Sequence, residues 1–168
     1  AANNLNQYYT KGDEDIIKPD PAKAKDLFRF GAEYGHPLHQ AIYADDLEEA
    51  GRKEEALQWF KKAAEGGHPG AWCDVGRCYF ERTGTAKDEV YAVECFEKEI
   101  PFEHIDSYNR LGKAYFFGRG VAQDYNKAFE LLSHAYDMGS KWGVFYLGKC
   151  CFQGWGTNRE WLLFAHAL

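Results

Sequence analysis

Residues 111–128 read LGKAYFFGRGVAQDYNKA, and weaker copies of this stretch recur along the chain in steps of 36 residues. A fixed period of roughly 20–50 residues is typical of proteins that stack one small structural unit many times. Such proteins usually present a long surface to a partner. The step is kept by Gly76, Gly112 and Gly148, by Gly84, Gly120 and Gly156, by Phe80, Phe116 and Phe152, and by Ala56, Ala92 and Ala128.

The best copy predicts a pair of helices joined by a glycine turn. Apolar residues in 105–117 fall three or four positions apart, which is the helical spacing. Gly118 and Gly120 then break the helix, because glycine favours helix ends and tight turns. Asp124 suits the N-cap or first turn of a second helix, which we expect to end at Gly139. Each unit is therefore expected to be two antiparallel helices.

The other copies extend this pattern over the whole chain. They predict helices at about 20–34, 37–50, 53–66, 69–82, 89–100 and 141–153. We expect an all-α fold, a right-handed α-solenoid of stacked antiparallel helix pairs, as a single domain over 1–168. Its parts are a half-unit 1–35, repeats 36–67, 68–103 and 104–139, and a partial repeat 140–168. The apolar segment 160–168 and the half-unit at the start predict a longer native array, or self-association through the C-terminal helix.

Composition and charge restrict the classes of partner. With 45% hydrophobic and 27% charged residues, the chain has globular composition. Its net charge of −6 disfavours nucleic acid, which needs a basic face. No apolar run approaches the roughly 18 residues that span a membrane. The five cysteines are odd in number and ignore the period, so we expect reduced thiols and a cytoplasmic protein, or a periplasmic or secreted one if a signal peptide was removed.

The sequence predicts no catalytic, metal or cofactor site. His36 and His39 have no cysteine pair nearby to complete a zinc site. Gly118 and Gly120 lack the preceding strand of a phosphate-binding loop. Cys73 with His68 is a weak candidate for nucleophilic catalysis, since a His-Pro pair is more often a turn signal. We therefore expect a protein that is not an enzyme and needs no cofactor.

The repeated residues resemble the Sel-one-like repeat, a branch of the tetratricopeptide-type α-solenoids. The residues that carry the resemblance are Leu111-Gly112, Tyr115, Gly118-Arg119-Gly120-Val121, Asp124 and Lys127-Ala128, with partial matches at Val75-Gly76 and Leu147-Gly148. The resemblance implies scaffold and adaptor roles in protein assemblies. One bacterial subgroup of this family has a disulfide in every repeat and binds β-lactams, and the irregular cysteines here depart from it.

The tetratricopeptide architecture implies that the first helix of each pair lines a concave groove. The positions expected there carry three cations, three aromatic rings and two further side chains. They are Arg77, Lys113 and Lys149, then Phe80, Phe116 and Phe152, and finally Asn109 and Trp142. A row of cations beside apolar rings suits an extended acidic peptide or a C-terminal carboxylate.

Alternatives remain open for both the residues and the function. The aromatic residues also suit packing between helices, and the lysines also suit a solvated surface. A protein-interaction module is the first expectation. The alternatives are a protein that binds a small molecule, of the cell-wall or β-lactam kind, and a regulatory segment of a larger enzyme.

Overall fold

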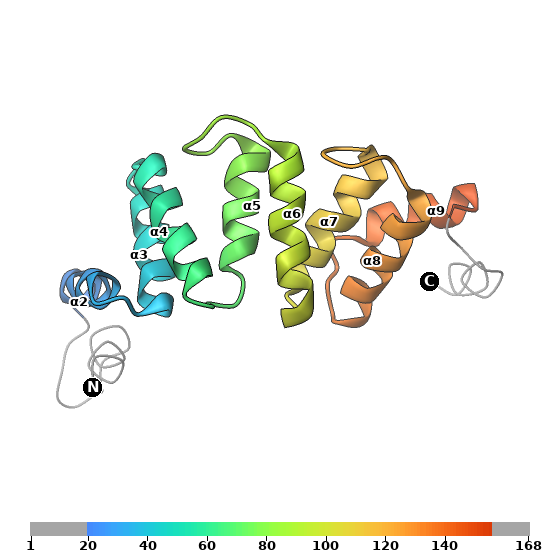
Figure 1. Cartoon of the computed structure of the whole chain (residues 1–168). Coiled ribbons are helices and arrows are strands. Elements are labelled where there is room, and N and C mark those ends of the chain that lie inside the picture. Colours follow the sequence, from blue (N-terminus) through green and yellow to red (C-terminus); the bar gives the residue numbers. More distant parts are fainter. Residues whose placement is uncertain (1–19, 156–168) are drawn as a thin grey trace, which may run out of the picture. The chain divides into compact units, whose positions relative to one another are not determined.

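The computed structural model describes residues 20–155 (Figure 1). Gly156, the first residues of the half-unit and the apolar segment 160–168 lie outside the described residues. Within 20–155 the chain forms eight α-helices, one 3-10 turn and no strand, so the predicted all-α fold is confirmed. The elements are α2 (Pro21–Glu33), α3 (Pro37–Glu49), α4 (Lys53–Glu65), α5 (Ala71–Glu81), α6 (Glu89–Glu99), η1 (Ile100–Phe102), α7 (Ile105–Phe117), α8 (Tyr125–Asp137) and α9 (Val144–Gln153).

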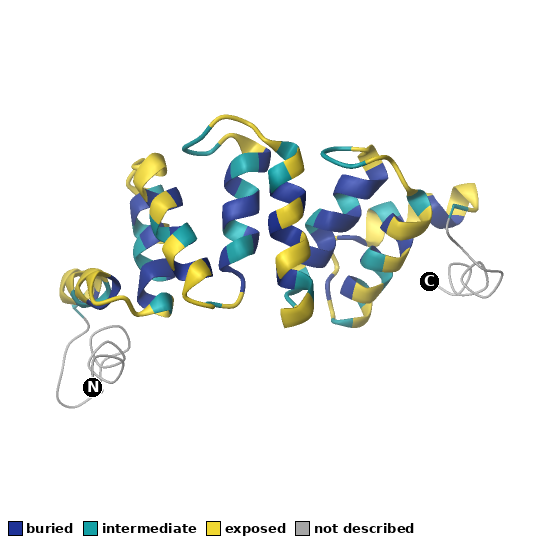
Figure 2. Cartoon of the chain, viewed as in Figure 1, coloured by how far each residue is buried: buried dark blue, intermediate teal, exposed yellow. Residues whose placement is uncertain are grey.

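The helices group into two compact units. Unit 1 holds α2, α3 and α4 together with Thr83–Thr85, and unit 2 holds α5 from Trp72 onward, α6, η1, α7, α8 and α9. In unit 1, α3 packs against both α2 and α4; in unit 2, α7 packs against α6 and α8, and α8 packs against α9. A single domain over 1–168 stays a prediction. In each unit the buried residues lie on the helix faces that meet a neighbouring helix (Figure 2).

Aspartate caps begin three of the helices. The side chains of Asp20, Asp88 and Asp124 each accept a hydrogen bond from the backbone N–H three residues later, at 3.1, 3.0 and 3.0 Å. These bonds satisfy donors that a helix leaves without a partner at its first turn. The predicted role of Asp124 as an N-cap is confirmed.

Two helices begin later than the sequence pattern predicted. Gly70 has a φ of 87°, a left-handed conformation that favours glycine, so α5 begins after it and not at residue 69. The hydroxyl of Ser140 accepts a hydrogen bond from the Trp142 N–H at 3.2 Å and holds a turn there. Helix α9 therefore begins at Val144, three residues after the predicted start.

The mid-helix glycines let the two helices of a repeat touch. A Cβ on Gly76 would lie 2.5 Å from a ring carbon of Phe96, and one on Gly112 would lie 2.7 Å from Cγ of Leu132. Both contacts are too short for a real side chain, so the predicted close approach is confirmed at these two positions. At Gly148 no described atom lies within 4 Å of such a Cβ.

The turn glycines serve contact with the preceding repeat. A Cβ on Gly120 would collide with the backbone of Glu89, at the start of α6. A Cβ on Gly84 would likewise collide with the backbone of Lys53, at the start of α4. Glu89 follows Lys53 by 36 positions, so both turns press on equivalent points. Gly84 and Gly120 thus mark backbone contact between successive repeats.

Candidate partner-binding site

A hollow of about 290 Å³ lies beside α5, α7 and the segment before α9. It brings together four of the predicted site residues, Phe80, Asn109, Lys113 and Trp142. The other lining residues are Glu81, Asp106, Arg110, Ser140 and Lys141. The sequence pattern therefore selected side chains that do share one surface of unit 2.

Two lysines of this hollow, Lys113 and Lys141, lie close to Trp142. The Nζ atom of Lys113 lies over the ring of Trp142, 5.1 Å from its centroid. Lys141 precedes that exposed tryptophan and is exposed too. Within residues 20–155, neither Lys113 nor Lys141 forms an ion pair.

Asn109 has a positioning role at the edge of the hollow. Only 3% of its surface is exposed, and its amide exchanges two hydrogen bonds with the hydroxyl of Ser140, at 2.8 and 3.2 Å. Since Ser140 also holds the turn at Trp142, this pair fixes the chain just before α9. The Asn109–Ser140 pair therefore holds the segment that carries Lys141 and Trp142.

A second hollow, of about 620 Å³, lies beside α7 and α9. Three more predicted residues, Phe116, Lys149 and Phe152, line it. The Nζ atom of Lys149 lies 4.8 Å from the ring centroid of Phe145, which repeats the arrangement of Lys113 over its tryptophan. The remaining lining residues are Phe117, Gln123, Tyr125, Val144, Phe145, Gly148, Gln153 and Trp155.

The three aromatic residues of the ladder differ in exposure. Phe116 is 6% exposed and packs against Tyr125, with 5.4 Å between the two ring centroids, whereas Phe152 is 87% exposed. Phe80 is buried, and its ring contacts the ring of Phe96 and the guanidinium of Arg119. Most of the surface of Phe80 and Phe116 is therefore packed against other side chains, as the alternative interpretation expected. The small exposed part of each ring lines one of the two hollows.

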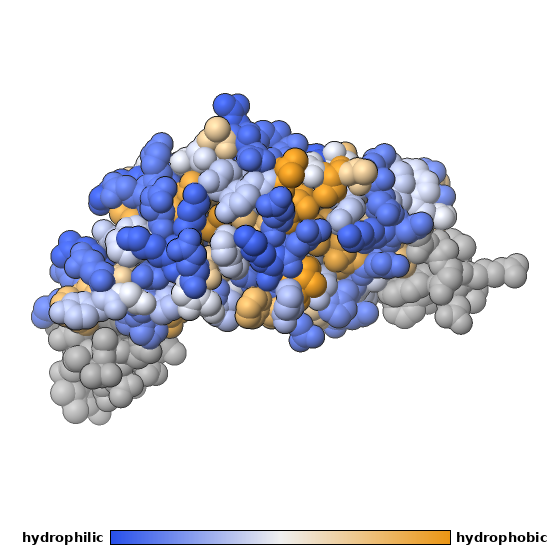
Figure 3. All heavy atoms as spheres, viewed as in Figure 1, coloured by the Kyte–Doolittle hydropathy of each residue, from blue (hydrophilic) through white to orange (hydrophobic). Residues whose placement is uncertain are grey.

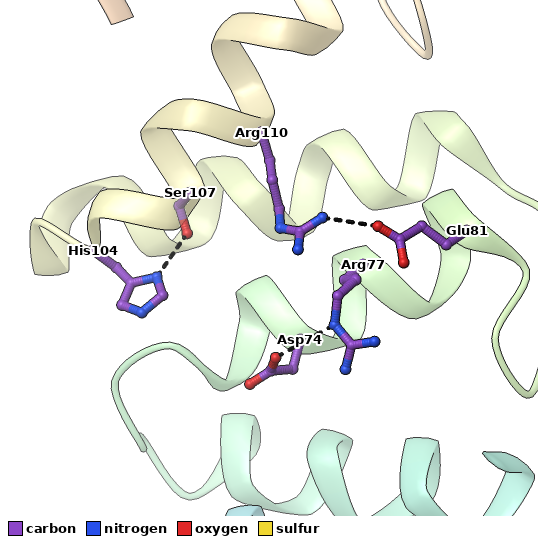
Figure 4. Close-up of polar contacts among 6 residues, drawn as sticks. All are labelled: Asp74, Arg77, Glu81, His104, Ser107 and Arg110. Carbon is purple, nitrogen blue, oxygen red and sulfur yellow. Dashed lines mark hydrogen bonds and ion pairs between the residues drawn. The ribbon is translucent and has the colours of Figure 1, made fainter. Parts of the chain in front are cut away.

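Arg77 is the one predicted residue that lines neither hollow. Its Nε atom lies 3.7 Å from a carboxylate oxygen of Asp74, one turn earlier on α5 (Figure 4). Another arginine, Arg110 on α7, does line the smaller hollow. Its Nη1 atom donates a hydrogen bond to Oε1 of Glu81 at 3.1 Å. The sequence analysis missed Arg110. Its position three residues before Lys113, on the same face of one helix, was the available signal.

Two side chains that could act as nucleophiles, Cys73 and Ser107, are buried. Burial raises the pKa of the Cys73 thiol to about 11, so it is protonated at neutral pH. Ser107 lies 3.4 Å from Nδ1 of His104, but its hydroxyl is fully buried (Figure 4). Among the described residues, no cluster of His, Cys, Asp or Glu could hold a metal ion. The described helices include none that is long and apolar enough to cross a membrane.

Comparison with known proteins places the chain among repeat proteins. The profile of the Sel1 repeat family matches residues 1–36, 52–68, 73–98 and 105–140. A comparison with curated proteins finds no match.

Solved structures share the fold. The chain is similar to c5321, a protective antigen present in uropathogenic Escherichia coli strains that displays an SLR fold. The TM-score is 0.84 at 30% identity, over 95% of this chain and 35% of that one. A Sel1 repeat protein from Oxalobacter formigenes has a TM-score of 0.80 at 24% identity, over 94% of this chain and 65% of that one. Cysteine rich protein B of Helicobacter pylori has a TM-score of 0.59 at 20% identity, over 80% of this chain and all of that one. The chain thus spans about a third of the length of c5321.

Proposed function

Since the chain belongs to the Sel1 repeat family, whose members generally serve as protein-interaction and scaffold modules, we propose that it binds an acidic peptide segment of a partner protein. The segment lies along the surface formed by α7, the chain before α9 and α9 itself. Its carboxylates contact Lys113, Lys141 and Lys149, and its apolar side chains enter the two hollows.

The observation that supports this proposal most is the set of lysines without ion pairs in an acidic protein. The chain carries 26 acidic and 20 basic residues, yet Lys113, Lys141 and Lys149 form no ion pair within the described part. Two of the three lie over aromatic rings. On the face shown in Figure 3, hydrophobic residues also reach the surface between hydrophilic ones. Cations beside exposed apolar groups suit a segment that carries both acids and apolar side chains.

A peptide titration tests the proposal. The probe is a labelled peptide of glutamates around one phenylalanine, with capped ends, and the matched probe replaces every glutamate by glutamine. The wild-type chain should bind the acidic probe more tightly, and binding should weaken with added salt. The triple variant Lys113→Gln, Lys141→Gln and Lys149→Gln should lose most of this binding and most of its salt dependence.

The control is a triple variant of equal net charge in unit 1. Lys53→Gln, Lys61→Gln and Lys62→Gln remove three exposed or half-buried cations from α4. If both triple variants weaken binding equally, the effect is one of net charge and the proposed surface is wrong. Equal affinity of the wild-type chain for both probes would also refute an acidic ligand.

A small-molecule ligand is the second candidate, because the larger hollow falls within the range of about 300–1,000 Å³ that ligand pockets occupy. Its lining is mostly aromatic, which suits a planar apolar compound. The five cysteines are all buried free thiols, unlike the disulfide-bonded subgroup that the sequence analysis set aside. NMR can test this candidate with a library of apolar fragments. Changes in the signals of Phe152 and Trp155 on addition of a fragment would favour a small molecule over a peptide.

A further inference from the structure

The smaller hollow is lined by an ion pair of the protein itself, between Glu81 and Arg110. The Arg110 guanidinium is a group that the carboxylate of an acidic ligand could also bind. Arg110 on α7 donates a hydrogen bond from Nη1 to Oε1 of Glu81 on α5, at 3.1 Å (Figure 4). Both side chains line the hollow, with exposed fractions of 29% and 50%. An incoming segment can therefore reach both groups.

The Arg110–Glu81 pair is incomplete in a way that favours exchange. A guanidinium has five N–H donors and binds a carboxylate best through two parallel bonds. Arg110 forms only one hydrogen bond with Glu81, and no other within the described residues. An exposed pair of this kind contributes little to stability, since each partner is well hydrated when separated. A second carboxylate can thus replace Glu81 at a small energetic cost.

We propose that Glu81 is a built-in competitor: its carboxylate holds the Arg110 guanidinium that a carboxylate of the partner takes over on binding. The inference rests on the proposed function. It adds Arg110 as the main anion-binding group of the smaller hollow and Glu81 as the residue that sets the affinity. When Glu81 is displaced, Arg110, Lys113 and Lys141 face the ligand together, opposed by Asp106 alone among the acids that line the hollow.

This role gives Glu81 a part in specificity. A segment with one weakly placed carboxylate cannot displace Glu81, because the exchange only replaces one single hydrogen bond with another. A segment whose carboxylate accepts two parallel N–H bonds from one edge of the Arg110 guanidinium gains a bond in the exchange. Glu81 therefore selects against acidic chains that lack a well-placed carboxylate.

A double-mutant cycle with the glutamate–phenylalanine probe tests the inference. Glu81→Gln should tighten binding roughly twofold to fivefold, since it removes a competitor no stronger than an exposed ion pair. Arg110→Gln should weaken binding. In the double variant the gain from Glu81→Gln should vanish, because the freed guanidinium is gone.

The control is Glu130→Gln, which removes the same charge from an exposed position on α8 outside both hollows. Its affinity for the probe should equal that of the wild-type chain. The inference is overturned if Glu81→Gln leaves binding unchanged or weaker, if its gain persists without Arg110, or if Glu130→Gln gives the same gain.

The failure of this inference is distinct from failure of the proposed function. Loss of binding in the lysine triple variant together with no effect of Glu81→Gln refutes the competitor and leaves the acidic-peptide surface standing. Absence of probe binding in the wild-type chain and in Glu81→Gln refutes both.

Discussion

Helices α7 and α9 share leucine, glycine, lysine and phenylalanine at positions 36 residues apart, yet the surroundings of these residues differ. Gly112 on α7 faces Leu132 of α8, while a Cβ on Gly148 of α9 would meet no described atom within 4 Å. Phe116 is buried, while Phe152 is almost fully exposed. The period decides which face of a helix a residue lies on. A neighbouring helix decides whether that residue packs or stays at the surface. The residue 36 positions after Leu132 is Leu168, which lies outside the described residues.

Alanine at the two phenylalanines should give the largest contrast. Phe116→Ala should lower the free energy of unfolding by about 3–5 kcal/mol, because it removes a buried ring that contacts Tyr125, Tyr146 and Trp155. Phe152→Ala should change it by less than about 0.5 kcal/mol. Urea unfolding followed by circular dichroism measures both. Equal losses would mean that Phe152 is buried in solution.

Leucine at the two mid-helix glycines should give the next contrast, with opposite signs. Gly112→Leu should destabilise the protein by roughly 1–3 kcal/mol, because the added side chain must displace Leu132. Gly148→Leu should stabilise it by up to about 1 kcal/mol, because leucine favours a helix interior more than glycine does. Thermal melts of the two variants beside the wild-type chain measure the difference. A destabilised Gly148→Leu would place a packing partner at α9 and remove the contrast.

Local rules allowed much of the fold to be predicted from the sequence. Helical spacing, aspartate caps and turn glycines act within a few residues, so the helix pairs and the cap at Asp124 followed from them. The start of α9 did not follow, because it depends on a hydrogen bond between Ser140 and the Trp142 backbone. Seven of the eight residues chosen from the sequence line the two hollows, and their role in partner binding stays a prediction. The sequence could not assign the exposure of each, since burial depends on neighbouring helices.

Pairings between repeats were beyond the sequence for a second reason. The Asn109–Ser140 and Arg110–Glu81 hydrogen bonds join residues 31 and 29 positions apart. Neither separation matches the period, and neither pair recurs as a ladder. Periodicity reports what all repeats share, whereas these contacts occur at one place. The features that shape the candidate site are therefore those that a repeat pattern hides.

Unit 1 also contains a close contact at a mid-helix glycine, and this contact should make stability depend on pH. A Cβ on Gly31 of α2 would collide with the ring of His39 on α3, so the imidazole fills the space that a leucine fills at Gly112. Burial, and then the charge of His36, lower the pKa of His39 below its usual 6.5. The folded state thus favours the neutral ring, while the unfolded chain takes up a proton near pH 6.5. The stability from this contact is complete above pH 6.5 and is lost as the pH falls through and below that value.

The measurement is the melting temperature of wild-type chain and His39→Phe between pH 7.5 and pH 5, a range of about one unit above and 1.5 below the usual histidine pKa. The phenylalanine keeps an aromatic ring against Gly31 but cannot be protonated. The wild-type chain should lose more stability on acidification than the variant. Parallel curves would show that His39 titrates alike in the folded and unfolded chain.

The smallest expected effect concerns the cations over aromatic rings, where α7 and α9 should behave alike. Lys113 lies over Trp142 at 5.1 Å and Lys149 over Phe145 at 4.8 Å, and each ring is exposed. An exposed cation–π contact contributes about 0.5–1 kcal/mol. Double-mutant cycles, Lys113→Gln with Trp142→Ala and Lys149→Gln with Phe145→Ala, isolate these couplings from the losses of each side chain. The two coupling energies should agree within about 0.5 kcal/mol. Agreement would show that the environment of each lysine is set by its own helix face. The packing of the glycine and phenylalanine positions depends in addition on a neighbouring helix. A coupling present on α7 and absent on α9 would instead mean that the α9 surface is rearranged in solution, and Lys149 would then have no place in the proposed binding surface.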